Sequence, residues 1–136
     1  MRQLNTDKCK LHKLNKFLRR EVNKSGWVKR ARKCYITRST NNLRVHHDGM
    51  SFSKISETAF KNLNIKYKGE FTECYSTTEL ILIKNEVLRL HKLYAKPITL
   101  TEDIHNELHR VYGTHVSHEQ LLEFKEQYNN RMEVVA

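Results

Sequence analysis

The chain of 136 residues is long enough for one domain with a modest core, since 38% of its residues are hydrophobic and 29% are charged. It carries 25 Lys/Arg and 15 Asp/Glu, a formal net charge of +10. No apolar run approaches the ~20 residues of a membrane-spanning helix, and no secretory signal is visible, so we expect a cytoplasmic protein. Three widely spaced cysteines without a CxxC pair argue against a disulfide scaffold or a cysteine zinc site.

The positive charge is concentrated in the first third of the chain. Residues 1–47 contain 14 Lys/Arg and two Asp/Glu, whereas the other 89 residues contain 11 basic and 13 acidic side chains. Cations at this density attract polyanions, because each cation placed near a phosphate releases a condensed counterion. We therefore expect a nucleic acid as the partner. An anionic membrane surface is the alternative, since a basic amphipathic helix can serve either, and a solvated basic face is the third interpretation.

The N-terminal half predicts a helix, a hairpin and a second helix. Thr6 or Asp7 can cap a first helix that runs to about Asn23, with apolar residues at helical spacing. The runs CYIT and LRVHH flank the polar stretch RSTNN, which is typical of a β-hairpin ended by Asp48-Gly49. Residues 51–66 then show helical spacing again, and a loop is expected from about residue 66 to residue 76.

Three helical signals follow in the C-terminal half. A strong helix is predicted from Thr77 to Tyr94, and Pro97 then forces an extended segment. The next helix should start at an N-cap at Thr101 and end before Gly113. The last helix should start at Ser117, where SHEQ forms a capping box.

Four of the eight histidines suggest a metal site. His46 and His47 lie at the end of the second predicted strand, where their side chains should point to opposite faces. His105 and His109 are four positions apart on a predicted helix, which places them on one face, a common geometry for two ligands of one metal. One histidine of the adjacent pair could be a third ligand, and the other would be available as a general base. Either pair alone is a weak signal, and the combination is stronger.

The order CYITRSTNNLRVHHD … ITLTEDIHNELHRVYG resembles the HNH endonucleases of the ββα-metal (His-Me finger) superfamily, most of all the homing-type and free-standing bacteriophage subgroup. The resemblance covers roughly residues 27–128. It implies an α+β, mostly helical fold with a ββα-metal finger, an inserted helical pair and flanking N- and C-terminal helices. A single nuclease domain, 1–136, would then consist of a basic N-terminal helix (1–26), the hairpin (27–50), the helical insert (51–96), the metal-binding helix (97–113) and the C-terminal helix (114–136).

The resemblance also implies roles for the four histidines. His47 matches the general base that activates water, His46 and His105 match metal ligands, and His109 matches a third ligand or a phosphate contact. The implied activity is metal-dependent cleavage of DNA, by nicking, with one divalent ion (Mg, Mn, Zn, Ni or Co). Double-stranded DNA is the expected substrate, the protein would be a monomer or homodimer, and a phage-encoded enzyme would act in the cytoplasm of a bacterial host.

Contacts to DNA phosphates are expected from the basic first third, and such contacts position DNA without reading its sequence. The candidates are Arg19, Arg20, Lys29, Arg30, Arg32, Lys33, Arg38 and Arg44. In this family an asparagine usually lies between the two halves of the motif. By spacing, its position here falls near Lys96, where the sequence has no asparagine. Two alternatives therefore stay open: a catalytically inactive nucleic-acid-binding protein on the same fold, and a binding module in which the histidines hold a structural zinc.

Overall fold

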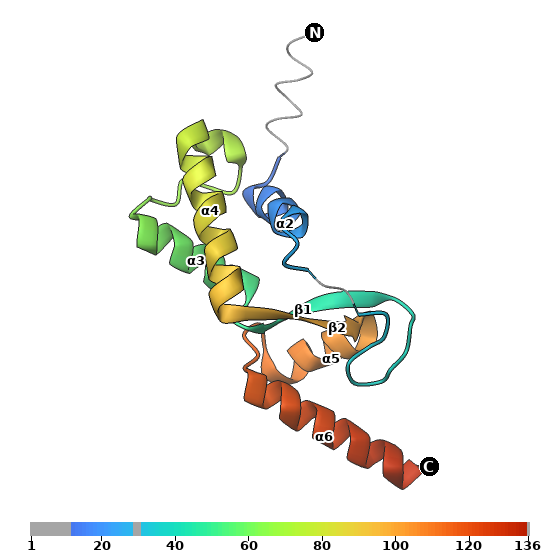
Figure 1. Ribbon diagram of the computed structural model, residues 1–136. Helices are drawn as coiled ribbons and strands as arrows, with labels where there is room; N and C mark the ends of the chain where they lie inside the picture. The colour runs from blue at the N-terminus through green and yellow to red at the C-terminus, as the bar shows by residue number, and fades with distance from the viewer. Residues whose placement is uncertain (1–11, 29–30, 136) are drawn as a thin grey trace. The chain divides into compact units, whose positions relative to one another are not determined.

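Two stretches of chain contribute to each of two units in the computed structural model, which describes residues 12–28 and 31–135 (Figure 1). Of the described residues, 12–27 and Ile55–Leu93 form the helical unit, and those within 28–54 and 94–135 form the sheet unit. The secondary structure is α+β, as expected, with helices and a two-stranded antiparallel sheet. Within the described ranges, no helix is long and apolar enough to cross a membrane.

Helix α2 (Leu14–Lys24) contributes an apolar stripe to the helical unit, because Leu14, Leu18 and Val22 are only 1–3% exposed. The sequence predicts a start at Thr6 or Asp7, and those residues lie outside the described ranges. The prediction is wrong for the two residues before Leu14. Lys13 has extended backbone angles and pairs with Phe71 in an isolated β-bridge, so the helix begins one residue later.

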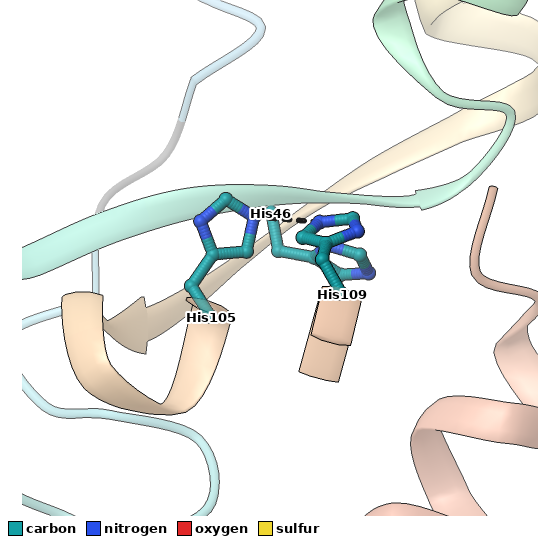
Figure 2. Close-up of side chains that lie close together, drawn as sticks. All are labelled: His46, His105 and His109. Atoms are coloured by element: carbon teal, nitrogen blue, oxygen red, sulfur yellow. Dashed lines mark hydrogen bonds between the residues drawn. The ribbon is translucent and has the colours of Figure 1, made fainter. Parts of the chain in front are cut away.

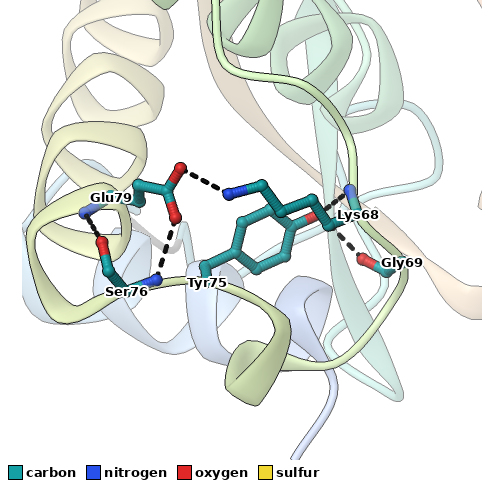
Figure 3. A network of polar contacts seen from close by, with 5 residues as sticks. All are labelled: Lys68, Gly69, Tyr75, Ser76 and Glu79. Atoms are coloured by element: carbon teal, nitrogen blue, oxygen red, sulfur yellow. Dashed lines mark hydrogen bonds and ion pairs between the residues drawn. The ribbon is translucent and has the colours of Figure 1, made fainter.

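The two helices expected after the HH pair are present as α3 (Phe52–Leu63) and α4 (Thr77–Tyr94). The segment between them, predicted to be a loop, contains one short 3₁₀ turn, η1 (Thr72–Cys74). Figure 3 shows the polar contacts that join the residues on either side of this turn. The Tyr75 hydroxyl donates to the Gly69 carbonyl (2.9 Å) and accepts from the Lys68 amide (2.8 Å), while Lys68 Nζ pairs with Glu79 (2.7 Å).

Helix α4 starts with a capping box that fixes its first turn. The Glu79 amide donates to Ser76 Oγ (3.1 Å), and the Ser76 amide donates to Glu79 Oε1 (2.9 Å) (Figure 3). These reciprocal bonds satisfy two amides at the helix start that have no partner within the helix. The loop before α4 is therefore tied to the helix through the same glutamate that binds Lys68.

The predicted β-hairpin is wrong in its first strand. Strand β1 (Leu43–Gly49) carries LRVHH as expected, but the CYIT run forms a turn at Tyr35–Thr37. The partner of β1 is β2 (Ala95–Thr101), which pairs antiparallel with His46 opposite Ile98 and His47 opposite Pro97. The Tyr35 amide donates to the Thr99 carbonyl (2.8 Å), so the CYIT segment borders β2 through this bond instead of pairing with β1. Proline is tolerated in β2 because a two-stranded sheet has only edge strands.

Helix α5 (Glu102–Tyr112) follows β2 directly and packs on both strands (Figure 1). As predicted, Thr101 is its N-cap and accepts from the Ile104 amide (3.3 Å), while Gly113, with φ of 86°, ends it. The capping box at Ser117 is also confirmed, and Ser117 and Gln120 exchange two bonds at the start of α6 (His118–Val135). The core of this unit joins β2, α5, the 113–117 segment and α6, with buried Leu100, Leu108, Val116, Leu121 and Phe124.

Candidate metal centre

Three histidine side chains meet between β1 and α5. His46 projects from the strand, and His105 and His109 project from consecutive turns of the helix, as Figure 2 shows. The ring centroid of His46 lies 5.5 Å from that of His105 and 5.4 Å from that of His109. One nitrogen from each ring can be chosen so that all three lie within 4.8 Å of one another. The structure thus brings together the three residues that the sequence predicts as metal ligands.

The burial pattern of β1 decides which histidine of the HH pair faces this cluster. His46 and Asp48 are buried, at 2% and 6% exposure, while His47 between them is half-buried. Successive side chains of a strand point to opposite faces, so His47 lies on the other face from His46, as predicted. The His47 ring makes an edge contact with the Phe52 ring, at 6.1 Å between centroids. His47 is therefore not a member of the three-histidine cluster.

His46 has polar atoms that the protein itself does not satisfy. Both of its ring nitrogens are buried, and neither has a hydrogen-bond partner within the described part of the chain. A buried polar group without a partner costs about 1–3 kcal/mol, so most native proteins avoid one. A metal ion at the cluster would give one of these nitrogens a ligand bond. This is the strongest local sign that the three rings form a binding site and not a packing contact.

His109 is oriented by a second contact that leaves its other nitrogen available. Its Nδ1 lies 2.8 Å from the Gly113 carbonyl oxygen, which can only accept, so Nδ1 carries the proton. The Nε2 atom then has a lone pair directed at His105 Nε2, 3.0 Å away, whose proton it accepts. Carbonyl contacts of this kind commonly fix the tautomer and orientation of metal-bound histidines. To bind a metal through Nε2, His105 must move that proton to its Nδ1.

The dimensions of the cluster are close to those of a zinc-type site. Zinc–nitrogen bonds of about 2.0–2.1 Å in a tetrahedral arrangement place ligand nitrogens roughly 3.3 Å apart. Here the His105 and His109 nitrogens are 3.0 Å apart, and the ligand nitrogens of the three rings lie within 4.8 Å of one another. Side-chain movements of about an ångström would bring all three to the spacing of a zinc site. Three imidazoles leave a fourth position for water or substrate, which is typical of catalytic sites, whereas structural zinc usually has four protein ligands.

His46 and His105 are held neutral in the absence of a metal. Burial, together with the nearby rings of His105 and His109, lowers the pKa of His46 to about 3. Burial, with smaller effects of His109 and the charge of Arg44, lowers the pKa of His105 to about 4. A neutral imidazole is the form that binds a metal. Both rings are therefore ready to act as ligands at neutral pH without first losing a proton.

The predicted phosphate-binding residues are spread over both units. In the sheet unit, the exposed Arg32, Lys33 and Arg38 lie in the segment before β1, and Arg44 lies on β1 itself, on the face that carries His46. Arg44 pairs with Glu102 at 3.3 Å, with both side chains about half exposed. Arg19 and Arg20 are exposed on α2 in the helical unit. Lys29 and Arg30 lie outside the described ranges.

One interaction beside the cluster was missed by sequence reasoning. The Asp48 carboxylate, two positions after His46, accepts a hydrogen bond from His118 Nδ1 at 2.6 Å. In the sequence, Asp48 ends the predicted hairpin and follows the HH pair, which it could tune, but nothing marks His118 as its partner. The capping box locates the start of α6 but cannot show which strand residue its first side chain reaches. No signal within one sequence links the two positions.

Comparisons with known proteins add no family to this geometry. No protein-family model matches the chain, and neither a curated protein nor a solved structure matches it. The functional interpretation therefore depends on the three histidines, the residues around them and the distribution of charge.

Proposed function

We propose that the protein is a metal-dependent endonuclease that hydrolyses phosphodiester bonds in DNA, with a divalent ion bound by His46, His105 and His109. The observation that carries the proposal is the three-histidine cluster, because three imidazole ligands leave one position of a tetrahedral ion for water or substrate. A metal ion bound there supplies Lewis-acid stabilisation of charge on a phosphate oxygen. Imidazole ligands suit zinc, nickel and cobalt, and manganese and magnesium belong in the same assay.

The arrangement of elements around the cluster supports the same proposal. Strand β1 supplies His46 and His47, β2 pairs with it, and α5 follows at once with His105 and His109. A strand, a second strand and a helix thus occur in this order, although the expected hairpin had both strands before the helical insert. The segment between the two strands contains α3 and α4, in the place of the expected helical insert.

In this proposal, His47 takes a proton from the attacking water. Its Cα lies about 3.8 Å from that of His46, because the two residues are consecutive. A phosphate that lies over the edge of β1 could contact both, although the side chains leave the strand on opposite faces. Arg44 is two positions before His46 on its face of the strand, so its guanidinium can contact a phosphate at the cluster. Arg44 would then exchange Glu102, its present partner, for the phosphate.

The test is conversion of supercoiled plasmid to open-circular and linear forms with Mn²⁺, Mg²⁺, Co²⁺, Ni²⁺ or Zn²⁺. We expect nicking that chelator abolishes, and large losses of rate for both His105→Ala and His47→Ala. His115→Ala is the matched control, because His115 is an exposed histidine of the same unit that bonds Ser51 and lies outside the cluster. Uncut plasmid with every metal, together with retained DNA binding, would contradict the proposal and favour a binding protein without catalysis.

Chelator also separates a catalytic site from a structural one. A catalytic ion can be removed with loss of activity alone, whereas removal of a structural zinc unfolds the surrounding domain. Far-ultraviolet circular dichroism in chelator should therefore keep its helical signal while cleavage disappears. Disappearance of both together would support the structural-zinc alternative.

A further inference from the structure

A hollow of about 530 Å³ lies on the helical unit, away from the histidine cluster in the sequence and in a different unit. Most of its lining comes from α2 and the segment before it, and Thr72 and Leu80 complete it. The lining residues from the first segment are His12, Lys16, Phe17, Arg19, Arg20 and Asn23. Three of these carry a permanent positive charge, and no carboxylate is among the described residues of the lining. An anionic ligand would therefore meet three cations in the lining, and the nearest carboxylate to Arg20, that of Glu21 at 4.0 Å, lies outside the lining.

The packing of α2 argues against a membrane surface as that ligand. A basic amphipathic helix binds a bilayer by inserting its apolar face below the headgroups. The apolar face of α2 consists of Leu14, Leu18 and Val22, and these side chains are already buried in the helical unit. What α2 leaves to solvent is its cationic face, and that face lines a concave surface. Such a surface suits a chain of phosphates better than a flat bilayer.

Phe17 distinguishes between two kinds of nucleic acid. Its ring is half-buried, lines the hollow, and lies 6.0 Å from the Arg20 guanidinium carbon. A positively charged groove that contains an aromatic ring is the usual recognition surface for single strands, because an unpaired base can stack on the ring while cations follow the backbone. In a duplex the base faces are stacked on one another and are not available to such a ring.

We propose that this hollow binds an unpaired strand of nucleic acid, with Lys16, Arg19 and Arg20 contacting phosphates and Phe17 stacking on a base. The inference deepens the proposed function, on which its biological meaning rests: the substrate would contain a single-stranded region. The binding itself needs no metal. It can therefore be measured in chelator, where success or failure is independent of cleavage.

The experiment measures anisotropy of fluorescent oligothymidylate, oligouridylate and a DNA hairpin duplex in chelator over a series of salt concentrations. The full-length protein should bind the single strands more tightly than the duplex. The double variant Lys16→Gln/Arg20→Gln should bind them about tenfold more weakly. The negative slope of log K against log salt should become shallower by about 0.7 for each phosphate contact that is lost. The two single strands show whether the sugar matters, and a preference for either is compatible with the shared chemistry.

The control is Lys61→Gln/Lys66→Gln, which removes the same charge from exposed residues of the helical unit that do not line the hollow. This variant should bind nearly as well as the unaltered protein. Phe17→Leu should bind about tenfold more weakly, as expected when a base is deprived of an aromatic partner, and Phe17→Tyr should restore binding. Recovery by tyrosine separates stacking from a general effect on folding, which circular dichroism monitors for each variant.

Three results would overturn the inference. The first is duplex binding as tight as single-strand binding, and the second is equal weakening in the hollow variant and the control variant. The third is capture by phosphatidylserine vesicles that depends on Lys16 and Arg20 while the oligonucleotides do not bind. The proposed function fails separately. Normal oligonucleotide binding with no plasmid cleavage would leave the hollow as a binding site and remove the nuclease.

Discussion

Asp48 at the end of β1 accepts a 2.6 Å hydrogen bond from Nδ1 of His118, the first residue of α6, across 70 positions of sequence. The carboxylate is 5% exposed and the histidine side chain is 60% exposed, so the bond reaches from the interior to the surface. The other carboxylate oxygen is buried without a hydrogen bond in the part of the chain that the structure describes. The bond to His118 thus links the strand that carries His46 to the C-terminal helix. Among the described residues, it is also the main compensation for burying the Asp48 carboxylate.

His118→Ala should be more destabilising than its exposed position suggests. The substitution leaves a buried carboxylate without its donor, which costs about 1–3 kcal/mol. Asp48→Asn/His118→Ala should regain part of this stability, because the buried charge is then gone, and a double-mutant cycle measures the coupling. Urea unfolding in chelator gives the free energies. His115→Ala is the control, and its free energy of unfolding should stay within about 0.5 kcal/mol of that of the unaltered protein. Equal destabilisation by His118→Ala and His115→Ala would contradict a stabilising role of the Asp48–His118 bond.

His46 should be unfavourable to the metal-free fold and essential to metal binding. Both of its nitrogens are buried without partners among the described residues, and leucine of similar size would remove that cost. We expect His46→Leu to raise the free energy of unfolding in chelator by about 1–2 kcal/mol. The same substitution should weaken Co²⁺ or Zn²⁺ binding by more than the roughly 10–100-fold effect of removing a group that only supports a ligand.

The measurements for His46→Leu are urea unfolding with and without metal, and calorimetric titration of the metal. In excess metal, the unaltered protein should become the more stable of the two, because a ligand that binds only the folded state adds stability. Such a reversal is the expected signature of a binding site. A variant that is less stable in chelator and binds metal normally would show that His46 only fills space.

Acid should destabilise the metal-free protein through the same histidines. The folded-state pKa values of His46 and His105, about 3 and about 4, lie below the unfolded value near 6.5. Above pH 6.5 both histidines are neutral in the folded and in the unfolded chain, so they do not make the stability depend on pH. As the pH falls from about 6.5 towards 4, these histidines bind protons in the unfolded chain but not in the folded one. The free energy of unfolding then falls by up to about 1.4 kcal/mol per pH unit for each histidine.

The check is unfolding in chelator at several pH values for the unaltered protein and His46→Leu. The advantage of the variant should grow as the pH falls, because it lacks one of the two groups. His91, which is fully buried in the helical unit, also has a lowered pKa, mainly from burial, and contributes equally to both proteins. A constant difference between the proteins from pH 7 to about 4 would contradict the assignment to His46.

Local signals in the sequence are sufficient for most of the helix limits and for the shared face of His105 and His109. The limits of α4 and the caps at Thr101, Gly113 and Ser117 follow from spacing and from side chains that bond the nearest amides. The His105–His109 pair needs only a regular helix to share a face. Its approach to His46 is inferred from the combined motif, since no local rule places a helix against a strand.

Pairing between distant segments cannot be inferred in this way. The CYIT run has the composition of a strand and lies close to LRVHH, so the sequence favours this nearby run as the partner of β1. The actual partner, β2, follows α3 and α4, and Pro97 makes it look like a plain extended segment. The Asp48–His118 bond was missed for the same reason. Its two ends meet only after the sheet and α6 have formed.

Gly49, at the end of β1, is a position where a methyl group should be costly. Its φ is +104°, and a Cβ built there would lie 2.4 Å from the Tyr94 carbonyl oxygen, which also accepts from the Met50 amide at 3.0 Å. Gly49→Ala must therefore strain the backbone and move the neighbouring chain. We expect the free energy of unfolding to fall by about 2–4 kcal/mol, combining roughly 1–3 kcal/mol of strain with the clash.

Gly26→Ala is the matched control, because Gly26 has a φ of +82° but nothing within 4 Å of the position of the added carbon. It should show the backbone strain alone, about 1 kcal/mol. Since Gly49 lies three positions after His46, its displacement should also weaken metal binding in calorimetric titration, whereas Gly26→Ala should not. Equal effects of the two substitutions on stability would mean that β1 shifts away from Tyr94 at no cost. The close approach would then not be what fixes the end of the strand beside the histidine cluster.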